Sequence, residues 1–326
     1  MVSDLEVQSV IPEASHPAAD VPIKRRSLQP DEEFTRTAQR SMLIFGLLFL
    51  SLIRANELKY FPKSYVMAKG SDSVMLPCGT KSQTNVMWKF ENGVVDSMDG
   101  PNLLVKHVDE LTLGEYTCLS ENEKASTFLL MEDENEEELD SLLSCRARSY
   151  DCAFNCRWND NKYEAVRLGL GPHCRDGGDP CQWVYSTHQS QDGSFHFRLT
   201  HSLTPYAEES SMLELTAEAI RGNYILRRTK RFYLRNIIQP DSPIVSWQEV
   251  GRNINVTIHP PSSWSTPHSF FSLEHQIQYE HKDDGKWHLS SIPMIPKQIT
   301  KLRAQSRDLL VQSAWSEWTS WAYTTM

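Results

Sequence analysis

Residues 315–319, near the end of the chain, read Trp315-Ser316-Glu317-Trp318-Thr319. Four stretches that read as strands precede them: 244–250 (IVSWQEV), 253–260 (NINVTIHP), 273–279 (LEHQIQY) and 286–292 (KWHLSSI). The tryptophan-rich stretch therefore closes a predicted β-sandwich. Taken alone, it also fits an ordinary strand that carries aromatic side chains on its surface.

A short connector precedes this sandwich. Residues 236–243 read NIIQPDSP, and Pro240 and Pro243 stiffen such a segment because each proline ring fixes one backbone dihedral. We predict a boundary here and a C-terminal module over residues 241–326.

The stretch 144–158 reads SCRARSYDCAFNCRW. It contains three cysteines and a tryptophan: Cys145, Cys152, Cys156 and Trp158. Thiolates at these positions, together with His173 and Cys174, offer a zinc site as one chemical alternative. No cysteine pair has the two-residue spacing of zinc knuckles, and an exported chain meets oxidising conditions that favour disulfides. We expect no metal here.

An acidic run separates this stretch from the residues before it. Residues 131–140 read MEDENEEELD, and like charges in sequence repel one another and favour solvation. The run predicts a solvated linker or exposed edge at a second boundary, with one module over 56–134 and another over 140–238. Calcium binding is disfavoured because no glycine-shaped loop accompanies the carboxylates.

Within 56–134 four residues form a recognisable constellation: Cys78, Trp88, Tyr116 and Cys118. Cys78 follows the apolar run 74–76, and Trp88 lies in a stretch whose alternate positions are apolar. This constellation resembles an immunoglobulin domain, which buries a tryptophan against a disulfide between its two sheets and has a tyrosine two residues before the second cysteine. The resemblance implies a disulfide between Cys78 and Cys118. Two reduced core cysteines are the alternative.

The strongest apolar run is 42–53 (MLIFGLLFLSLI), and it is too short to span a bilayer comfortably. Arg36 and Arg40 precede it, and Ala55 follows as a small residue suited to cleavage. This arrangement predicts a secretory signal within an N-terminal extension over 1–55, cleaved after Ala55. A signal anchor and a buried core helix are the alternatives. We expect a secreted, extracellular mature chain without a membrane span.

Composition excludes some classes of function. The 326 residues carry a formal net charge of -9, which disfavours a broad phosphate-binding surface and hence nucleic acid. Hydrophobic residues make up 40% of the chain, enough for packed cores. No nucleophile elbow, glycine-rich phosphate loop or paired-histidine metal motif occurs in the sequence, so we expect no enzyme and no cofactor.

The stretch 315–319 is similar to the WSxWS box of the class I cytokine receptors, with Thr319 in place of the last serine. In that family the tryptophan rings stack with arginine guanidinium groups of a neighbouring strand. The resemblance implies that Arg303 and Arg307 form this ladder with Trp315 and Trp318.

The resemblance extends along the chain. Cys145 and Cys156, followed closely by Trp158, resemble the first module of the cytokine-receptor homology region, which implies that these two cysteines pair. We therefore expect an all-β chain in which an immunoglobulin-like sandwich is followed by two fibronectin type III-like sandwiches.

Soluble members of this receptor-like family serve as subunits of two-chain cytokines. They bind a four-helix-bundle alpha subunit at the bend between the last two modules and engage a cell-surface cytokine receptor. Carried over by position, the partner-binding loops include Phe270, Phe271, Ser306, Arg307 and Asp308. The family has an acidic residue at the place of Ser306, so its charged contact to the partner is missing here. A soluble cytokine alpha-receptor or decoy is the alternative function.

Three cysteines remain once these two pairs are set aside: Cys152, Cys174 and Cys181. An odd cysteine in a secreted chain indicates a bridge to another chain. The family's interchain cysteine corresponds here to Thr204, which cannot form one. Either Cys174 pairs with Cys181 and leaves Cys152 free, or one of those two reaches the partner.

Two modification sites follow from local sequence. Asn255 begins an Asn-Val-Thr sequon, which predicts N-glycosylation on an exposed face. Trp315 and Trp318 each begin a W-x-x-W pattern that resembles a C-mannosylation site.

Overall fold

The computed structural model describes residues 58–80, 86–91, 93–95, 101–120, 123–134, 137–177, 180–186, 189–205 and 209–324. The predicted signal sequence, with Arg36, Arg40, the apolar run and Ala55, lies outside the described residues. Across the described ranges, no helix has the length and apolar character needed to cross a bilayer.

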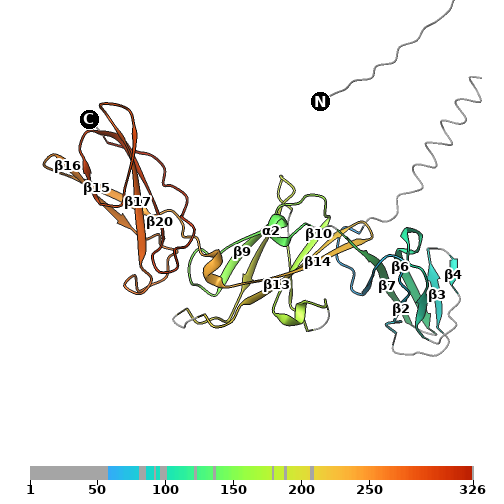
Figure 1. Cartoon of the computed structure of the whole chain (residues 1–326). Helices are drawn as coiled ribbons and strands as arrows, with labels where there is room; N and C mark the ends of the chain where they lie inside the picture. Colours follow the sequence, from blue (N-terminus) through green and yellow to red (C-terminus); the bar gives the residue numbers. More distant parts are fainter. Residues whose placement is uncertain are drawn as a thin grey trace, which may run out of the picture. The chain divides into compact units, whose positions relative to one another are not determined.

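The described chain is built almost entirely of strands, which confirms the predicted all-β fold class (Figure 1). Its helical elements are one short α-helix and three short 3-10 helices: α2 (Leu139–Leu142), η1 (Glu110–Thr112), η2 (Pro172–Cys174) and η3 (Leu234–Ile237). The sheets are consistent with immunoglobulin-like and fibronectin-like sandwiches. We refer to residues 58–134, 137–239 and 240–324 as the N-terminal, middle and C-terminal regions.

The N-terminal region has seven strands among its described residues. They are β1 (Tyr65–Ala68), β2 (Val74–Leu76), β3 (Met87–Phe90), β4 (Gly93–Val95), β5 (Leu103–Val105), β6 (Gly114–Ser120) and β7 (Glu123–Glu132). A disulfide joins Cys78 to Cys118, and the fully buried Trp88 lies in the same core cluster. The Tyr116 hydroxyl donates a 2.8 Å hydrogen bond to the Thr112 carbonyl oxygen. These residues form the core that the cysteine and aromatic spacing predicted.

The middle region contains seven strands among its described residues. They are β8 (Leu143–Arg146), β9 (Ala153–Trp158), β10 (Ala165–Leu170), β11 (Trp183–Tyr185), β12 (Phe195–Thr200), β13 (Leu213–Arg221) and β14 (Tyr224–Phe232). Strands β12, β9 and β8 form one antiparallel sheet. Alternate residues of β9 point inward, so Phe154, Cys156 and Trp158 are buried. Trp158 is the tryptophan that sequence reasoning associated with the cysteine pair.

A second sheet runs from the middle region into the N-terminal region. Its strand order is β11-β10-β13-β14-β7-β6-β3-β4, and β1 pairs with β7. The link between the regions is a parallel pairing in which Tyr224 and Ile225 of β14 face Met131 and Glu132 of β7. The two regions therefore share backbone hydrogen bonds.

This pairing corrects the interpretation of the start of the acidic run as a solvated linker or exposed edge, whereas Glu134, Glu137, Glu138 and Asp140 are exposed as predicted. Strand β7 continues through Glu132, and Asp133 is 5% exposed. The Asp133 carboxylate accepts a hydrogen bond from the Tyr163 hydroxyl and forms a 3.1 Å ion pair with Arg221. Like-charge repulsion was the wrong guide here, because these partners compensate the buried carboxylate.

The C-terminal region has seven strands among its described residues. They are β15 (Ile244–Val250), β16 (Asn253–His259), β17 (Leu273–His281), β18 (Trp287–Ser290), β19 (Met294–Pro296), β20 (Ile299–Asp308) and β21 (Ala322–Tyr323). One sheet has the order β15-β16-β19 and the other β18-β17-β20-β21. Strands β17 and β20 lie side by side (Figure 1). Inward-facing residues such as Ile254, Ile277 and Leu302 form the core between the two sheets.

Candidate partner-binding site at the second junction

The tryptophan-rich stretch is attached to β20 by hydroxyl side chains three residues apart. Each hydroxyl accepts one hydrogen bond from a backbone N–H of β20, and the three donors are alternate residues of that strand. Ser313 accepts from Asp308, Ser316 from Ser306 and Thr319 from Ala304, all at 3.0 Å. Because the accepting group is a hydroxyl oxygen, threonine replaces the usual serine at position 319 without loss of the bond.

The tryptophan rings face the outer surface of β20. The Arg307 guanidinium lies 4.6 Å from the Trp315 ring centroid. Arg303 lies between two rings, 4.8 Å from Trp318 and 4.2 Å from Trp321. Sequence reasoning missed Trp321 as a ladder member, although it continues the three-residue spacing of the indoles.

The ladder has a further cation, because Lys301 lies 4.8 Å from Trp287 and 5.2 Å from Trp321. The opposing strand β17 faces these cations with acidic and amide groups. Glu280 and Glu274 pair with Lys301 and Arg307, and the Arg303 Nε donates to Gln278 at 2.7 Å. The cations are therefore held by charge from one side and by aromatic rings from the other.

Hydrogen bonds from Arg146 hold the connector between the middle and C-terminal regions. Its guanidinium donates to the carbonyl oxygens of Gln239 (2.9 Å) and Pro240 (2.7 Å) and to the Asp241 carboxylate (2.7 Å). The Gln239 side chain in turn donates to the Trp315 carbonyl oxygen at 2.9 Å. The box is thus anchored to the connector as well as to β20.

Tyr150 joins the two regions beside the connector. Its ring stacks on Phe271 with centroids 5.1 Å apart and meets Trp264 edge-on at 5.9 Å. Its hydroxyl donates to the Asp308 carboxylate at 3.0 Å. Burial, and then the negative charge of Asp308, raise the pKa of Tyr150, so the hydroxyl keeps its proton.

A hollow of about 430 Å³, which we call the junction hollow, lies between the two regions at this point. Its lining combines apolar and polar residues: Tyr150, Leu203, Thr204, Pro205, Glu209, Leu234, Arg235, Phe270, Phe271, Asp308, Leu310 and Val311. At its rim Phe270 is 48% exposed and Leu310 is 74% exposed. Large apolar side chains that remain this accessible beside a concave surface are typical of binding sites.

Both carboxylates of the junction hollow already have donors. Asp308 accepts from the Tyr150 hydroxyl and from the backbone N–H groups of Leu310 (2.8 Å) and Val311 (2.9 Å). Glu209 accepts from the backbone N–H of Leu234 and pairs with Arg235 at 3.3 Å. The hollow therefore offers an incoming side chain mainly apolar contacts.

Three of the residues predicted to lie in partner-binding loops are buried in the structure. Ser306 and Asp308 lie in strand β20 and are 0% and 2% exposed, and Phe271 is 4% exposed. Their side chains are used inside the chain, because Ser306 contacts His275 Nδ1 at 2.7 Å and Phe271 packs on Tyr150. Arg307, also in β20, is held by Glu274 and Trp315. Phe270 is the accessible member of the predicted set.

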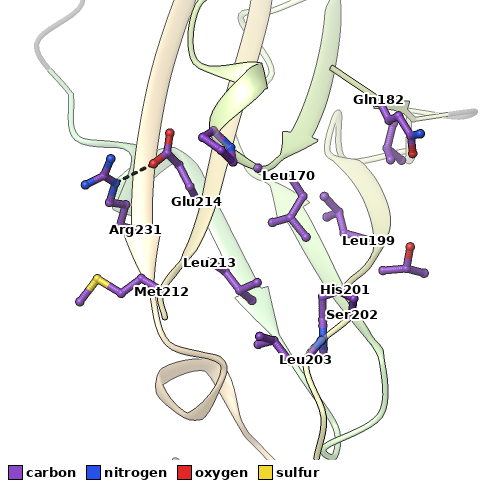
Figure 2. Close-up of a pocket in the computed structure, with 14 residues that line it drawn as sticks. Leu170, Gln182, Leu199, His201, Ser202, Leu203, Met212, Leu213, Glu214 and Arg231 are labelled. Atoms are coloured by element: carbon purple, nitrogen blue, oxygen red, sulfur yellow. Dashed lines mark hydrogen bonds and ion pairs between the residues drawn. The ribbon is translucent and has the colours of Figure 1, made fainter. Parts of the chain in front are cut away.

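A second hollow, of about 810 Å³, opens at one end of the middle region, and we call it the end hollow. Figure 2 shows Leu170, Leu199 and Leu213 within it and the ion pair of Glu214 with Arg231 at its edge. Burial alone raises the pKa of Glu214, but hydrogen bonds from Arg175 and Arg231 outweigh it and leave the pKa lowered. Leu203 lines both hollows.

Three disulfides occur among the described residues: Cys78–Cys118, Cys145–Cys156 and Cys174–Cys181. The last lies directly over Gly169, where a Cβ atom would come within 2.5 Å of Cys174 Sγ, so no larger residue fits. Cys152 has a free, exposed thiol. Its carbonyl oxygen accepts from the backbone N–H of His201 at 2.9 Å, which places Cys152 beside the segment that leads to Thr204.

The predicted modification sites lie on the C-terminal region. Asn255 is half-buried on the central strand β16, on the face opposite the buried Ile254 and Val256. Trp315 and Trp318 are partly exposed within the ladder. Modification of all three remains a prediction.

These features define a class of protein: an all-β chain, with sheets consistent with sandwiches, whose last region carries a tryptophan–cation ladder. A protein-family profile described as "Cytokine interleukin-12p40 C-terminus" matches residues 140–221. Its start coincides with the beginning of the predicted middle module.

The chain is also similar to individual curated proteins. It is 27% identical to interleukin-12 subunit beta of Bubalus bubalis, of Lama glama and of Sus scrofa, and each match covers 81% of this chain and 89% of the relative. The resemblance inferred from the motifs is confirmed: over most of its length the chain is similar to interleukin-12 beta subunits.

Proposed function

We propose that the chain is a secreted cytokine subunit that binds a four-helix-bundle alpha subunit and forms with it a heterodimer of the interleukin-12 and interleukin-23 type. The similarity to interleukin-12 beta subunits over 81% of the chain carries this proposal. Three disulfides support secretion, because such bonds persist mainly in oxidising compartments. The work of such a protein is binding, without catalysis.

The junction hollow is the proposed seat of the alpha subunit. Phe270 and Leu310 present accessible apolar surface at its rim, and its two carboxylates are already occupied. An aromatic or aliphatic side chain of a partner helix suits this lining better than a cation does. Aromatic and aliphatic anchors in a well-shaped pocket supply much of the binding energy at protein interfaces.

Cys152 is the proposed interchain cysteine. It is exposed, it has no partner within the chain, and it lies across a main-chain hydrogen bond from His201, three residues before Thr204. Thr204 and Tyr150 both line the junction hollow. A partner seated in the hollow therefore passes close to the Cys152 thiol.

The N-terminal region is the proposed contact for a cell-surface cytokine receptor. Met75 and Leu104 face each other across β2 and β5 and are 46% and 36% exposed. Met87 and Val94 add further exposed apolar surface in the same region. Exposed apolar side chains on both sheets of this region are available to a receptor.

A free soluble alpha-receptor or decoy is the alternative from a different class. The two functions differ in assembly, because a cytokine subunit forms a stable secreted complex and a decoy binds a circulating ligand reversibly. Co-expression of the full chain with four-helix alpha subunits of the interleukin-12 and interleukin-23 type separates them. Recovery of this chain as a monomer with every alpha subunit would refute the main proposal.

Substitution at the hollow tests the site. Leu310→Glu places a charge at an exposed rim position and should lower heterodimer yield at least about tenfold, because burying an unpaired carboxylate is costly. Leu289→Glu is the matched control, since Leu289 is 59% exposed on β18 and does not line the hollow. Equal yields for both variants would show that the partner binds elsewhere.

The thiol has its own test. With Cys152→Ser, the heterodimer should still form on size-exclusion chromatography but should separate on a non-reducing gel. A covalent heterodimer that persists in this variant would assign the link to another cysteine.

A further inference from the structure

The contact between the N-terminal and middle regions contains a buried group of charged side chains. Glu218 of β13 is 0% exposed, and two arginines of the neighbouring strands flank it. Arg167 of β10 lies 2.6 Å from one carboxylate oxygen, and Arg227 of β14 lies 2.6 Å from the other. We call these three residues the buried triad. All belong to the middle region.

Tyr65 brings the N-terminal region into this group. It is the first residue of β1, and its hydroxyl donates to the Glu218 carboxylate at 2.8 Å. The Tyr65 hydroxyl oxygen also accepts hydrogen bonds from Arg167 at 2.8 Å and from Arg227 at 3.2 Å. One hydroxyl of the N-terminal region thus contacts all three members of the triad.

Neighbouring groups exclude water from the triad. The Arg167 guanidinium lies 4.4 Å from the Phe61 ring and 4.1 Å from the Trp183 ring. On the other side, a Cβ on Gly177 would lie 2.0 Å from Arg227 Nη2, so the loop closed by the Cys174–Cys181 disulfide covers that arginine. Charged hydrogen bonds shielded in this way are stronger than exposed ones.

Two further kinds of contact act at the same place. Strands β7 and β14 pair in parallel, and the Asp133 N–H donates to the Ile225 carbonyl oxygen at 2.9 Å. An apolar cluster joins Leu58 and Leu130 of the N-terminal region to Ile220 and Ile225 of the middle region. Main-chain, apolar and charged contacts therefore cross one junction together.

We propose that Tyr65 locks the buried triad and makes the N-terminal and middle regions one cooperative unit that unfolds and moves as a single body. Tyr65 is a positioning residue: removing its hydroxyl takes one donor from Glu218 and one acceptor from each arginine. The N-terminal region then loses its contact with the triad, although its own core and the ion pair of Asp133 with Arg221 are untouched. The inference does not depend on which partner the chain binds.

Hydrogen exchange of the full-length secreted chain, followed by mass spectrometry at increasing urea, tests the lock. In the parent chain, peptides from β6 and β7 should show the same free energy of opening, with the same dependence on urea, as peptides from β13 and β14. Tyr65→Phe should accelerate exchange in both sets by roughly 10- to 100-fold, the range expected for lost hydrogen bonds to charged groups. Peptides from β17 and β20 should not change.

The chain offers a matched control on the same strand. Glu214 of β13 is also flanked by two arginines, Arg175 and Arg231, but has no contact to Tyr65. Because the two regions open as one unit in the parent chain, Glu214→Gln should accelerate exchange in β6 as well as in β13, and its effect on β6 should disappear when Tyr65→Phe is added. Tyr65→Phe keeps the ring and removes only an oxygen, so the variant folds.

Two results would overturn the proposal. One is a Tyr65→Phe variant whose acceleration is confined to either region alone. The other is a parent chain in which β6 peptides open at clearly lower urea than β13 peptides. Acceleration of β6 by Glu214→Gln in the parent chain, lost in the Tyr65→Phe background, supports the lock.

Discussion

The two junctions of the described chain are held together by different kinds of contact. The first, between the N-terminal and middle regions, is continuous: strands β7 and β14 pair, and Glu218 is fully buried between Arg167 and Arg227. The second, between the middle and C-terminal regions, consists of side-chain hydrogen bonds and aromatic stacking around a hollow of about 430 Å³.

This difference separates a junction with a structural role from the junction at which we propose that a partner binds. At the buried triad of the first junction the charged groups are paired, and a hollow of about 400 Å³ at the same junction is lined mainly by polar residues such as Glu110, Glu164 and Arg221. The second junction keeps Phe270 and Leu310 accessible beside a concave surface. Folding of this chain therefore completes the first junction and leaves the second open to a partner.

The largest expected effect is on the free energy of unfolding, and it is found by replacing one arginine at each junction and comparing the losses. Arg167→Met leaves the buried Glu218 short of a partner and should lower the free energy of unfolding by about 3–5 kcal/mol. Arg146→Met removes a more exposed ion pair and should cost roughly 1 kcal/mol. Urea denaturation of the two variants measures both. An equal loss of stability in Arg146→Met and Arg167→Met would contradict the difference between the two junctions.

A smaller effect is expected from the tyrosine of the second junction. Tyr150→Phe removes a donor to the buried Asp308 carboxylate and should cost about 1.5–3 kcal/mol. The loss should appear in hydrogen exchange of the C-terminal region and not in that of β6. Tyr224→Phe is the control, because its bond to Glu110 is exposed and should contribute less than about 0.5 kcal/mol. Acceleration at β6 would contradict the independence of the junctions.

The box that supports the second junction depends on a hydroxyl at position 319. Thr319→Val leaves the buried Ala304 N–H without its side-chain acceptor and should cost about 1–2 kcal/mol in the free energy of unfolding. Thr319→Ser keeps the oxygen and should be nearly neutral. Thermal denaturation of the pair is the measurement, and equal losses would assign the role to the threonine methyl group.

The smallest effect concerns pH. Burial lowers the pKa of His201 and of His275, with Glu274 opposing the shift at His275. The unfolded chain, with a histidine pKa of about 6.5, therefore binds more protons than the folded chain as pH falls below that value. Stability should decrease on acidification from about pH 6.5 toward the lower folded pKa, by no more than about 1 kcal/mol for each histidine.

His201 lines the end hollow, three residues before Thr204 of the junction hollow, and His275 contacts Ser306 of β20. His275→Gln should therefore flatten the decrease in midpoint urea concentration between pH 7.5 and 5.5. An unchanged pH slope would show that other groups cause it.

Much of the fold and part of the candidate site could be predicted from residue spacing. The interval from Cys78 to Trp88 and the Tyr116–Cys118 pair indicate a sandwich core, because that core needs a disulfide, a ring and a tyrosine corner at set positions. Stacking of Arg303 and Arg307 on the box followed from the resemblance, and the distances agree. Burial of Ser306 could not be predicted, since it depends on which face of β20 turns toward the core together with Leu302.

What the sequence alone determined about this protein was its strand-rich class, its likeness to a receptor-type family and the odd number of its cysteines, because these follow from residue type and local spacing. The tertiary structure alone decided that Cys152 keeps a free thiol, that β7 joins β14, and that the apolar rim of the junction hollow centres on Leu310. Such features arise from contacts between residues far apart in the chain, whose burial and partners no local pattern records.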